Sequence, residues 1–152
     1  MSLKMSDILT PARAVTGQTV TSKKKLLELL GQRLAEQLDA PTAEEIFDRL
    51  LERERLGSTG FGDGIAIPHC RLPGCNSAMG LLVQLREPID FDAVDRQPVD
   101  LIFTLVVPEQ ATEEHLQVLA MLAERFQQPN YRQSLRQAEN NTALFEAATQ
   151  PQ

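Results

Sequence analysis

The first third of the chain carries apolar residues at steps of three and four, which is the spacing of one face of an α-helix. A segment that Thr21 or Ser22 can cap, and that Asp39-Ala-Pro41 ends, is therefore predicted to be helical. The apolar positions of this segment are Leu26, Leu27, Leu30, Leu34 and Leu38.

Further helices are predicted on both sides of the middle of the chain. Thr42-Ala-Glu-Glu45 has the pattern of a capping box and indicates the start of a second helix. Apolar residues return at helical spacing from Thr112 to Phe126, which predicts a third helix. Two short helices are expected around residues 131–137 and 142–148.

The middle of the chain has the pattern of β-strands. A short strand is predicted at Ile65–Ile67 and a longer one at Met79–Leu85. Val99–Val107 is almost continuously apolar and rich in β-branched residues, as is typical of a central strand buried on both faces. Helices before and after these strands predict an α/β fold, a mixed sheet with helices on both faces. Because no internal boundary is evident, we expect one domain over residues 1–152.

Composition and charge narrow the possible functions. The 152 residues include 15 Lys and Arg against 21 Asp and Glu, which gives a net charge of −6. A nucleic-acid binder needs a basic surface, so no nucleic-acid partner is expected. The longest apolar run, Leu101–Val107, is far shorter than the ~20 residues of a membrane helix, so no membrane insertion is expected.

The two cysteines, Cys70 and Cys75, suggest reduced thiols rather than a disulfide framework. Together with an N-terminus that lacks the pattern of a signal peptide, they predict a cytoplasmic protein. His69, Cys70, Cys75 and His115 can be grouped as a zinc-like set. The adjacent His-Cys pair does not match common ligand spacings, so we predict no metal.

Four of the eight glycines fall in the segment Gly57-Ser-Thr-Gly-Phe-Gly-Asp-Gly64. The segment matches neither the P-loop pattern nor the dinucleotide-binding pattern. One interpretation is a hairpin or a helix-to-strand connection. The other is an anion-binding loop of backbone N–H groups and hydroxyls. The candidate phosphoryl-binding residues of that loop are Ser58, Thr59, Gly60, Gly62 and Gly64.

Two histidines are candidates for chemistry near this loop. His69 follows Pro68, which restricts the chain and helps to hold the imidazole in one place. A neutral imidazole keeps one nitrogen free as a nucleophile while the other nitrogen carries the proton. His115 lies in the first turn of the helix after the central strand, on its core-facing side. Ligand sites in open α/β sheets tend to lie at such strand ends.

Arg53 lies on one face of the second predicted helix, with Ile46 and Leu50. An arginine on an apolar face needs a partner. A phosphoryl group is suitable because the guanidinium can bind two of its oxygens. A carboxylate such as Asp90 or Asp92 is the alternative.

The run Arg53-Glu-Arg-Leu-Gly-Ser-Thr-Gly-Phe-Gly-Asp-Gly-Ile-Ala-Ile-Pro-His69 closely resembles the active-site signature of bacterial phosphotransferase-system (PTS) enzyme IIA proteins of the fructose/mannitol/nitrogen-regulatory type. The resemblance extends from about Leu26 to Phe126, and Leu56-Gly-Ser-Thr-Gly looks most like the nitrogen-regulatory branch. Further matching runs are Pro88-Ile-Asp-Phe-Asp-Ala93, Gln97-Pro-Val-Asp-Leu101, Val107-Pro108 and Glu114-His-Leu116.

The resemblance implies a single EIIA type-2 domain (core about 5–149) with a five-stranded mixed sheet flanked by helices. It also implies phosphorylation of His69, at Nε2, by a phosphorylated HPr-like carrier protein. Arg53 and His115 would then stabilise the phosphoryl charge and hydrogen-bond to the phosphoryl group or the imidazole, with no metal or other cofactor. Two positions depart from the family pattern. Cys70 stands where Gly is usual, and Asp63, where Asn is common, would add a repulsive carboxylate near the phosphoryl site.

The sequence thus predicts a phosphotransferase component, a phosphohistidine carrier whose phosphorylation state regulates nitrogen-related targets and potassium-transport regulators. One alternative is a sugar-specific IIA protein that passes the phosphoryl group to a IIB domain. The other is a regulatory docking module without phosphotransfer.

Overall fold

The computed structural model describes residues 4–38, 41–110 and 113–151, with only the backbone described at 113–114. The strands are β1 (Ala14–Gln18), β2 (Gly60–Gly62), β3 (Ile65–Ala66), β4 (His69–Leu72), β5 (Met79–Ile89) and β6 (Val99–Pro108). The helices are α1 (Lys23–Ala35), α2 (Ala43–Arg55), α3 (Glu113–Phe126), α4 (Pro129–Gln137) and α5 (Asn141–Thr149), and 3-10 turns at Met5–Asp7 and Pro11–Arg13 precede β1. None of these helices is both long enough and apolar enough to cross a membrane.

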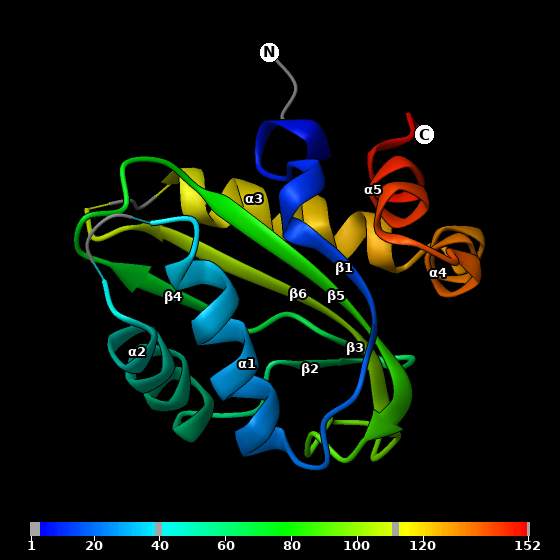
Figure 1. The fold of residues 1–152 in the computed structure, drawn as a ribbon, viewed down its shortest axis with the longest axis horizontal. Helices are drawn as coiled ribbons and strands as arrows, with labels where there is room; N and C mark the ends of the chain where they lie inside the picture. Colours follow the sequence, from blue (N-terminus) through cyan, green and yellow to red (C-terminus); the bar gives the residue numbers. More distant parts are fainter. Residues whose placement is uncertain (1–3, 39–40, 111–112, 152) are drawn as a thin grey trace.

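The described strands form one mixed sheet that runs through the middle of the molecule (Figure 1). Their order is β1-β5-β6-β3-β2, and β4 also pairs with β6. Strand β5 is antiparallel to β6, whereas β3 and β4 run parallel to it. The predicted α/β fold is therefore confirmed, with six strands in the described residues rather than five.

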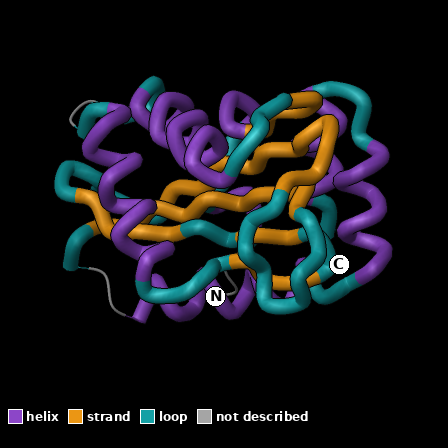
Figure 2. The backbone as a smooth tube through the Cα atoms, turned by 90° about the horizontal axis from the view of Figure 1, so that it is seen from below, coloured by secondary structure: helices purple, strands orange, loops and turns teal. Residues whose placement is uncertain are grey.

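Helices cover the sheet on both faces, as the helices outside the band of strands show (Figure 2). The leucines of α1 and α2 pack against one face, which includes Ile102 and Val106 of β6. The apolar residues of α3, α4 and α5 pack against the other face, which includes Phe103 and Leu105. Because successive residues of a strand point to opposite faces, β6 is buried on both, as its composition predicts.

Side-chain caps begin the two N-terminal helices where the sequence predicts them. The Ser22 hydroxyl accepts a hydrogen bond from the Lys25 N–H, and the Thr42 hydroxyl accepts one from the Glu45 N–H, each at 3.1 Å. Helix α1 ends at Ala35, before the last predicted apolar position. The predicted stop at residues 39–40 and the predicted helix start at residue 112 lie outside the described residues.

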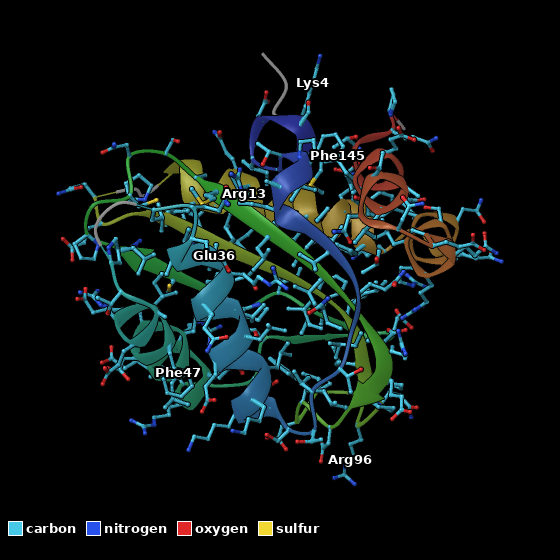
Figure 3. All side chains as sticks on the ribbon, in the orientation of Figure 1. Lys4, Arg13, Glu36, Phe47, Arg96 and Phe145 are labelled. Carbon is cyan, nitrogen blue, oxygen red and sulfur yellow. The ribbon has the colours of Figure 1, made fainter. Side chains whose placement is uncertain are left out.

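Strand β6 places different parts of the chain at its two ends. Its Leu105 pairs with His69 of β4. Toward the start of the strand, the Leu101 N–H donates to the Gly64 carbonyl at 3.1 Å. Four residues of strand, about 13 Å, separate these two positions. The loop between β5 and β6 lies at the start of β6, where Arg96 projects outward (Figure 3).

Candidate active site

His69 begins strand β4 and is half-buried. Its Nδ1 lies 2.9 Å from the Ile67 carbonyl oxygen, which can only accept a hydrogen bond. This contact assigns the ring proton to Nδ1 and leaves the lone pair on Nε2. The local chain therefore selects the tautomer in which Nε2 is the nucleophilic atom.

Arg53 reaches His69 from the last turn of α2. Its Nε–H donates to His69 Nε2 at 3.2 Å, and its Nη1 donates to the Gly57 carbonyl at 2.9 Å. The predicted alternative, an ion pair with Asp90 or Asp92, does not form. Asp92 instead lies 3.8 Å from the Lys23 ammonium. The Arg53 guanidinium thus binds the lone pair of His69 Nε2, and both of its partners, the imidazole and the Gly57 carbonyl, are uncharged.

His115, on α3, lies beside His69. The two imidazole centroids are 5.4 Å apart and the ring planes are inclined by 60°. The Nδ1 atom of His115 is buried and has no hydrogen-bond partner among the described residues. The structure therefore brings the three predicted residues, Arg53, His69 and His115, together at one place.

A cavity of about 510 Å³ opens beside these residues. Its lining also includes Arg49 and Arg71, which the sequence reasoning missed. The sequence spacing of both arginines relates them to predicted site residues. Arg49 precedes Arg53 by one helical turn, and Arg71 follows His69 by two residues on the same side of the strand. Glu52 is the one acidic residue among the described residues of the lining, and Arg49 also pairs with Glu109 at 3.5 Å. The excess of arginine favours an anionic occupant.

Burial and nearby positive charge lower the pKa of both imidazoles. Desolvation lowers the pKa of His69 below its ordinary value, and the charge of Arg53 lowers it further, against the opposing effects of the Ile67 hydrogen bond and Glu54. Desolvation also lowers the pKa of His115, followed by the charges of His69 and Arg71. A neutral His69 retains its lone pair at neutral pH.

The upstream half of the glycine-rich segment does not present donors to this cavity. The Thr59 N–H and hydroxyl both donate to the Glu54 carboxylate. The Ser58 hydroxyl donates to the Phe91 carbonyl at 3.1 Å and accepts from the Gly60 N–H at 3.0 Å. The Thr59 and Gly60 N–H groups and both hydroxyls thus have partners within the loop and core, and phosphoryl binding by Ser58, Thr59 and Gly60 stays a prediction.

The downstream half forms a hairpin turn away from the site. Gly62 and Gly64 have φ values of +107° and +83°, which glycine adopts without strain. The Asp63 N–H donates to the Asp95 carboxylate at 3.0 Å, and the Arg136 guanidinium donates to the Asp63 carbonyl. Since this turn lies near the start of β6, neither the glycines nor the Asp63 carboxylate belongs to the cavity. Of the two interpretations, the structure supports the hairpin.

Glu54 is a further residue of this region that the sequence reasoning missed. Its carboxylate is almost fully buried, with 3% of the side chain exposed, and lies 2.9 Å from the Lys23 ammonium. One signal was available, since Glu54 follows Ile46 and Leu50 at steps of four on the buried stripe of α2. An acidic residue at such a position needs partners in the fold.

The thiol beside His69 is buried. Burial raises the pKa of Cys70 to about 12. Burial also raises the pKa of Cys75, and both thiols are free. Within residues 4–38, 41–110 and 113–151, no group of three or more His, Cys, Asp or Glu side chains is placed to hold a metal ion.

Known proteins match this chain over most of its length. Residues 7–150 match the family described as "Phosphoenolpyruvate-dependent sugar phosphotransferase system, EIIA 2". A nitrogen regulatory protein of Pseudomonas aeruginosa is 46% identical over 144 residues, which cover 95% of this chain and 94% of that protein.

Solved structures agree with the sequence match. The crystal structure of nitrogen regulatory protein IIA-Ntr from Neisseria meningitidis superposes with a TM-score of 0.89 at 42% identity, covering 95% of this chain and 99% of that one. The structure of IIA mannitol from Escherichia coli superposes with a TM-score of 0.74 at 18% identity, covering 91% of this chain and 97% of that one. At this lower identity the second likeness shows a shared fold.

Proposed function

Because the chain belongs to the EIIA 2 family of the phosphoenolpyruvate-dependent sugar phosphotransferase system, we propose that it is a phosphohistidine carrier of the nitrogen-regulatory branch. It accepts a phosphoryl group on Nε2 of His69 from a phosphorylated HPr-like protein. The observation that carries this proposal is the pair of contacts at His69, which assigns the proton to Nδ1 and the lone pair to Nε2.

The proposed transfer needs no proton movement on the acceptor ring. The Nε2 lone pair of His69 attacks the phosphorus of the donor phosphohistidine, and the donor N–P bond breaks with its electron pair returning to the donor nitrogen. The acceptor ring keeps its Nδ1 proton and becomes cationic. The Ile67 carbonyl, already 2.9 Å away, stabilises that charge as a hydrogen-bond acceptor.

Arg53 has to exchange partners during this step. Its Nε–H occupies the Nε2 lone pair at rest, so it must move aside before the attack. In the phosphorylated state it can bind the phosphoryl oxygens, since a guanidinium pairs with two such oxygens at once. Arg49 and Arg71 add positive charge around the same cavity, and His115 lies on its wall.

The surroundings of the cavity suit a protein donor. Leu56, which lines the cavity, is 85% exposed, and Leu116, which follows His115, is 67% exposed. Exposed large apolar side chains beside a reactive group are typical of protein–protein contact surfaces. We propose that an HPr-like carrier binds here in the cytoplasm, to the whole chain acting as one EIIA type-2 domain.

We further propose that the phosphorylation state regulates partner proteins connected with nitrogen metabolism and potassium transport. The support is the likeness to proteins that are named nitrogen regulatory proteins, at 46% and 42% identity over nearly the whole chain. In the resting state the Gly57 carbonyl beside exposed Leu56 is bound by Arg53. If Arg53 binds a phosphoryl group instead, this carbonyl loses its hydrogen bond. A partner protein could then distinguish the two states by the free Gly57 carbonyl.

The test is phosphorylation by phosphoenolpyruvate and the two upstream proteins, enzyme I and the HPr-like carrier of the nitrogen branch. Wild-type protein should acquire an acid-labile label, because protonation makes a phosphorylated nitrogen a leaving group, and His69→Ala should acquire none. A label that persists in His69→Ala would overturn the assignment. Rapid loss of label to an added IIB domain would instead support a sugar-specific role, and partner binding without any labelling would support a docking module.

A further inference from the structure

The buried carboxylate of Glu54 lies one residue from Arg53, at the end of α2. With 3% of its side chain exposed, it accepts hydrogen bonds from the Thr59 N–H and the Thr59 hydroxyl, and it pairs with the Lys23 ammonium at 2.9 Å. We propose that Glu54 is a positioning residue that orients Arg53, and through Arg53 the phosphoryl-acceptor nitrogen of His69. This inference rests on the proposed function of His69.

The path from Glu54 to His69 consists of contacts along the four-residue loop 56–59, which joins α2 to β2. Glu54 fixes the downstream end of the loop through its two bonds with Thr59. The Glu54 carbonyl fixes the upstream end by accepting a hydrogen bond from the Gly57 N–H at 3.2 Å. The Gly57 carbonyl then binds Arg53 Nη1 at 2.9 Å, while Arg53 Nε binds His69 Nε2 at 3.2 Å. The position of the guanidinium therefore depends on the path of the loop.

Glycine alone would not hold the loop in this path. The Gly57 side of the loop is exposed, and a side chain there would have nothing within 4 Å to pack against. Without an anchor, the Gly57 carbonyl would sample many orientations, since glycine loses the most conformational freedom on ordering. The anchor is charge-assisted, because a carboxylate receives both Thr59 donors.

Lys23 compensates the buried charge of Glu54 and also contacts Phe91. An isolated buried carboxylate is strongly unfavourable. The Lys23 ammonium compensates that charge, and it also lies 4.6 Å from the centroid of the Phe91 ring. The glycine-rich motif therefore acts on the phosphoryl site by positioning Arg53.

The test combines a structural signature in the unphosphorylated protein with transfer kinetics. In wild type, the Arg53 Nε–H should give a slowly exchanging NMR resonance with a contact to the His69 ring. Thr59→Val removes the hydroxyl donor, and Thr59→Ser keeps it. Glu54→Gln keeps the shape of the side chain but replaces one acceptor oxygen with an NH₂ group. The amide can therefore not accept hydrogen bonds from both Thr59 and Lys23. Glu44→Gln, an exposed change in the first turn of the same helix, is the matched control.

We expect Thr59→Val and Glu54→Gln to lose the slow Arg53 resonance and to be phosphorylated about tenfold more slowly at saturating carrier, with KM for the carrier unchanged. Thr59→Ser and Glu44→Gln should behave as wild type. An unchanged Arg53 resonance and transfer rate in Thr59→Val would overturn the proposal, even if the melting temperature falls. If the wild type accepts no phosphoryl group, the proposed function fails, whereas the Arg53 resonance still decides the positioning role.

Discussion

The two ends of strand β6 both hold an arginine against the glycine-rich segment, and they use it differently. At the start of the strand, Arg136 binds the Asp100 carboxylate through Nε and Nη2, at 3.0 and 2.9 Å, and also donates to the Asp63 carbonyl. At the other end, Arg53 donates to the neutral His69 imidazole and to the Gly57 carbonyl. The first arginine is neutralised by a carboxylate, and the second has no carboxylate partner among the described side chains.

This difference separates a structural arginine from a functional one. A bidentate pair with a carboxylate cancels the charge of the guanidinium and fixes the hairpin turn against α4. An arginine held by uncharged acceptors keeps its charge available for an anion that arrives later. The type of partner, more than burial or sequence position, thus indicates which arginine serves phosphoryl transfer.

The largest expected effect is the loss of phosphorylation rate when Arg53 is replaced, compared with the same replacement of Arg136. Arg53→Gln should lower the rate of His69 phosphorylation by about 10²-fold, because the charge that stabilises the transferring group is lost. Arg136→Gln, the matched change at the other end of β6, should leave that rate within twofold of wild type. Single-turnover labelling by the phosphorylated carrier measures both. Equal effects of the two changes would remove the distinction between the two ends.

A smaller effect is expected from His115, which faces the ring of His69 without a hydrogen bond to it. His115→Ala should slow phosphorylation about tenfold, the size expected for one hydrogen bond to a charged group. The half-life of the phosphorylated protein should shorten as well, since the same imidazole faces the bound group. Single-turnover labelling and the decay of acid-labile label provide the two values. A wild-type half-life in the variant would assign His115 to packing.

The pH dependence should reflect the environment of His69. Burial, followed by the charge of Arg53, lowers the pKa of this imidazole below the unperturbed value of 6.5. Protonation removes the lone pair on Nε2, so the acceptor should stay active at pH 6.5 and lose activity only as the pH falls through the lowered pKa. NMR titration of His69 in native protein and in urea measures the shift. A native pKa at or above 6.5 would show that the site does not keep the imidazole neutral in this way.

At the structural end of β6, the expected effect is on stability alone. Arg136→Gln removes a bidentate pair that is about one-third exposed, so the free energy of unfolding should fall by about 1 kcal/mol. Urea unfolding followed by circular dichroism measures this change. Arg53→Gln, in the same assay, should cost no more than that. A larger loss of stability in Arg53→Gln would mean that its slow phosphorylation reflects damage to the fold.

The smallest effect is expected at Cys70, although this thiol is the immediate neighbour of His69. With its pKa raised to about 12 by burial, it should react with iodoacetamide at pH 8 far more slowly than the same thiol in urea. Cys70→Ala should retain phosphotransfer within twofold. Fast alkylation of native protein with loss of phosphotransfer would contradict this and show a reactive thiol at the site.

The sequence predicts most of the fold because its long elements follow clear periodicities. The capped leucine stripe of α1 and the apolar run of β6 are examples. The strands β1, β2 and β4 were missed, and β5 is four residues longer than predicted. These missed strands have at most five residues and include glycine or polar positions, so pairing with a neighbour rather than local preference makes them strands.

The candidate site was predicted in part for the same physical reason. Arg53 is predicted from its helical spacing on α2, and His115 from its place in the first turn of α3. His69 is predicted from the preceding Pro68 and the family motif, since its strand β4 is not predicted. The glycine-rich segment leaves two interpretations open because its sequence is equally compatible with an anion-binding loop and a hairpin. The pairing of β2 with β3 and the contacts of Thr59 with the buried Glu54 are tertiary features, which cannot be read from spacing alone.

The central claim, that Nε2 of His69 carries the phosphoryl group while Nδ1 keeps its proton, is tested most directly by NMR of the protein labelled with ¹⁵N and phosphorylated by its carrier. Long-range ¹H–¹⁵N correlations of the His69 ring should show phosphorus coupled to Nε2 and a protonated Nδ1 bound to the Ile67 carbonyl. Phosphorus on Nδ1, or on any residue other than His69, would contradict the account.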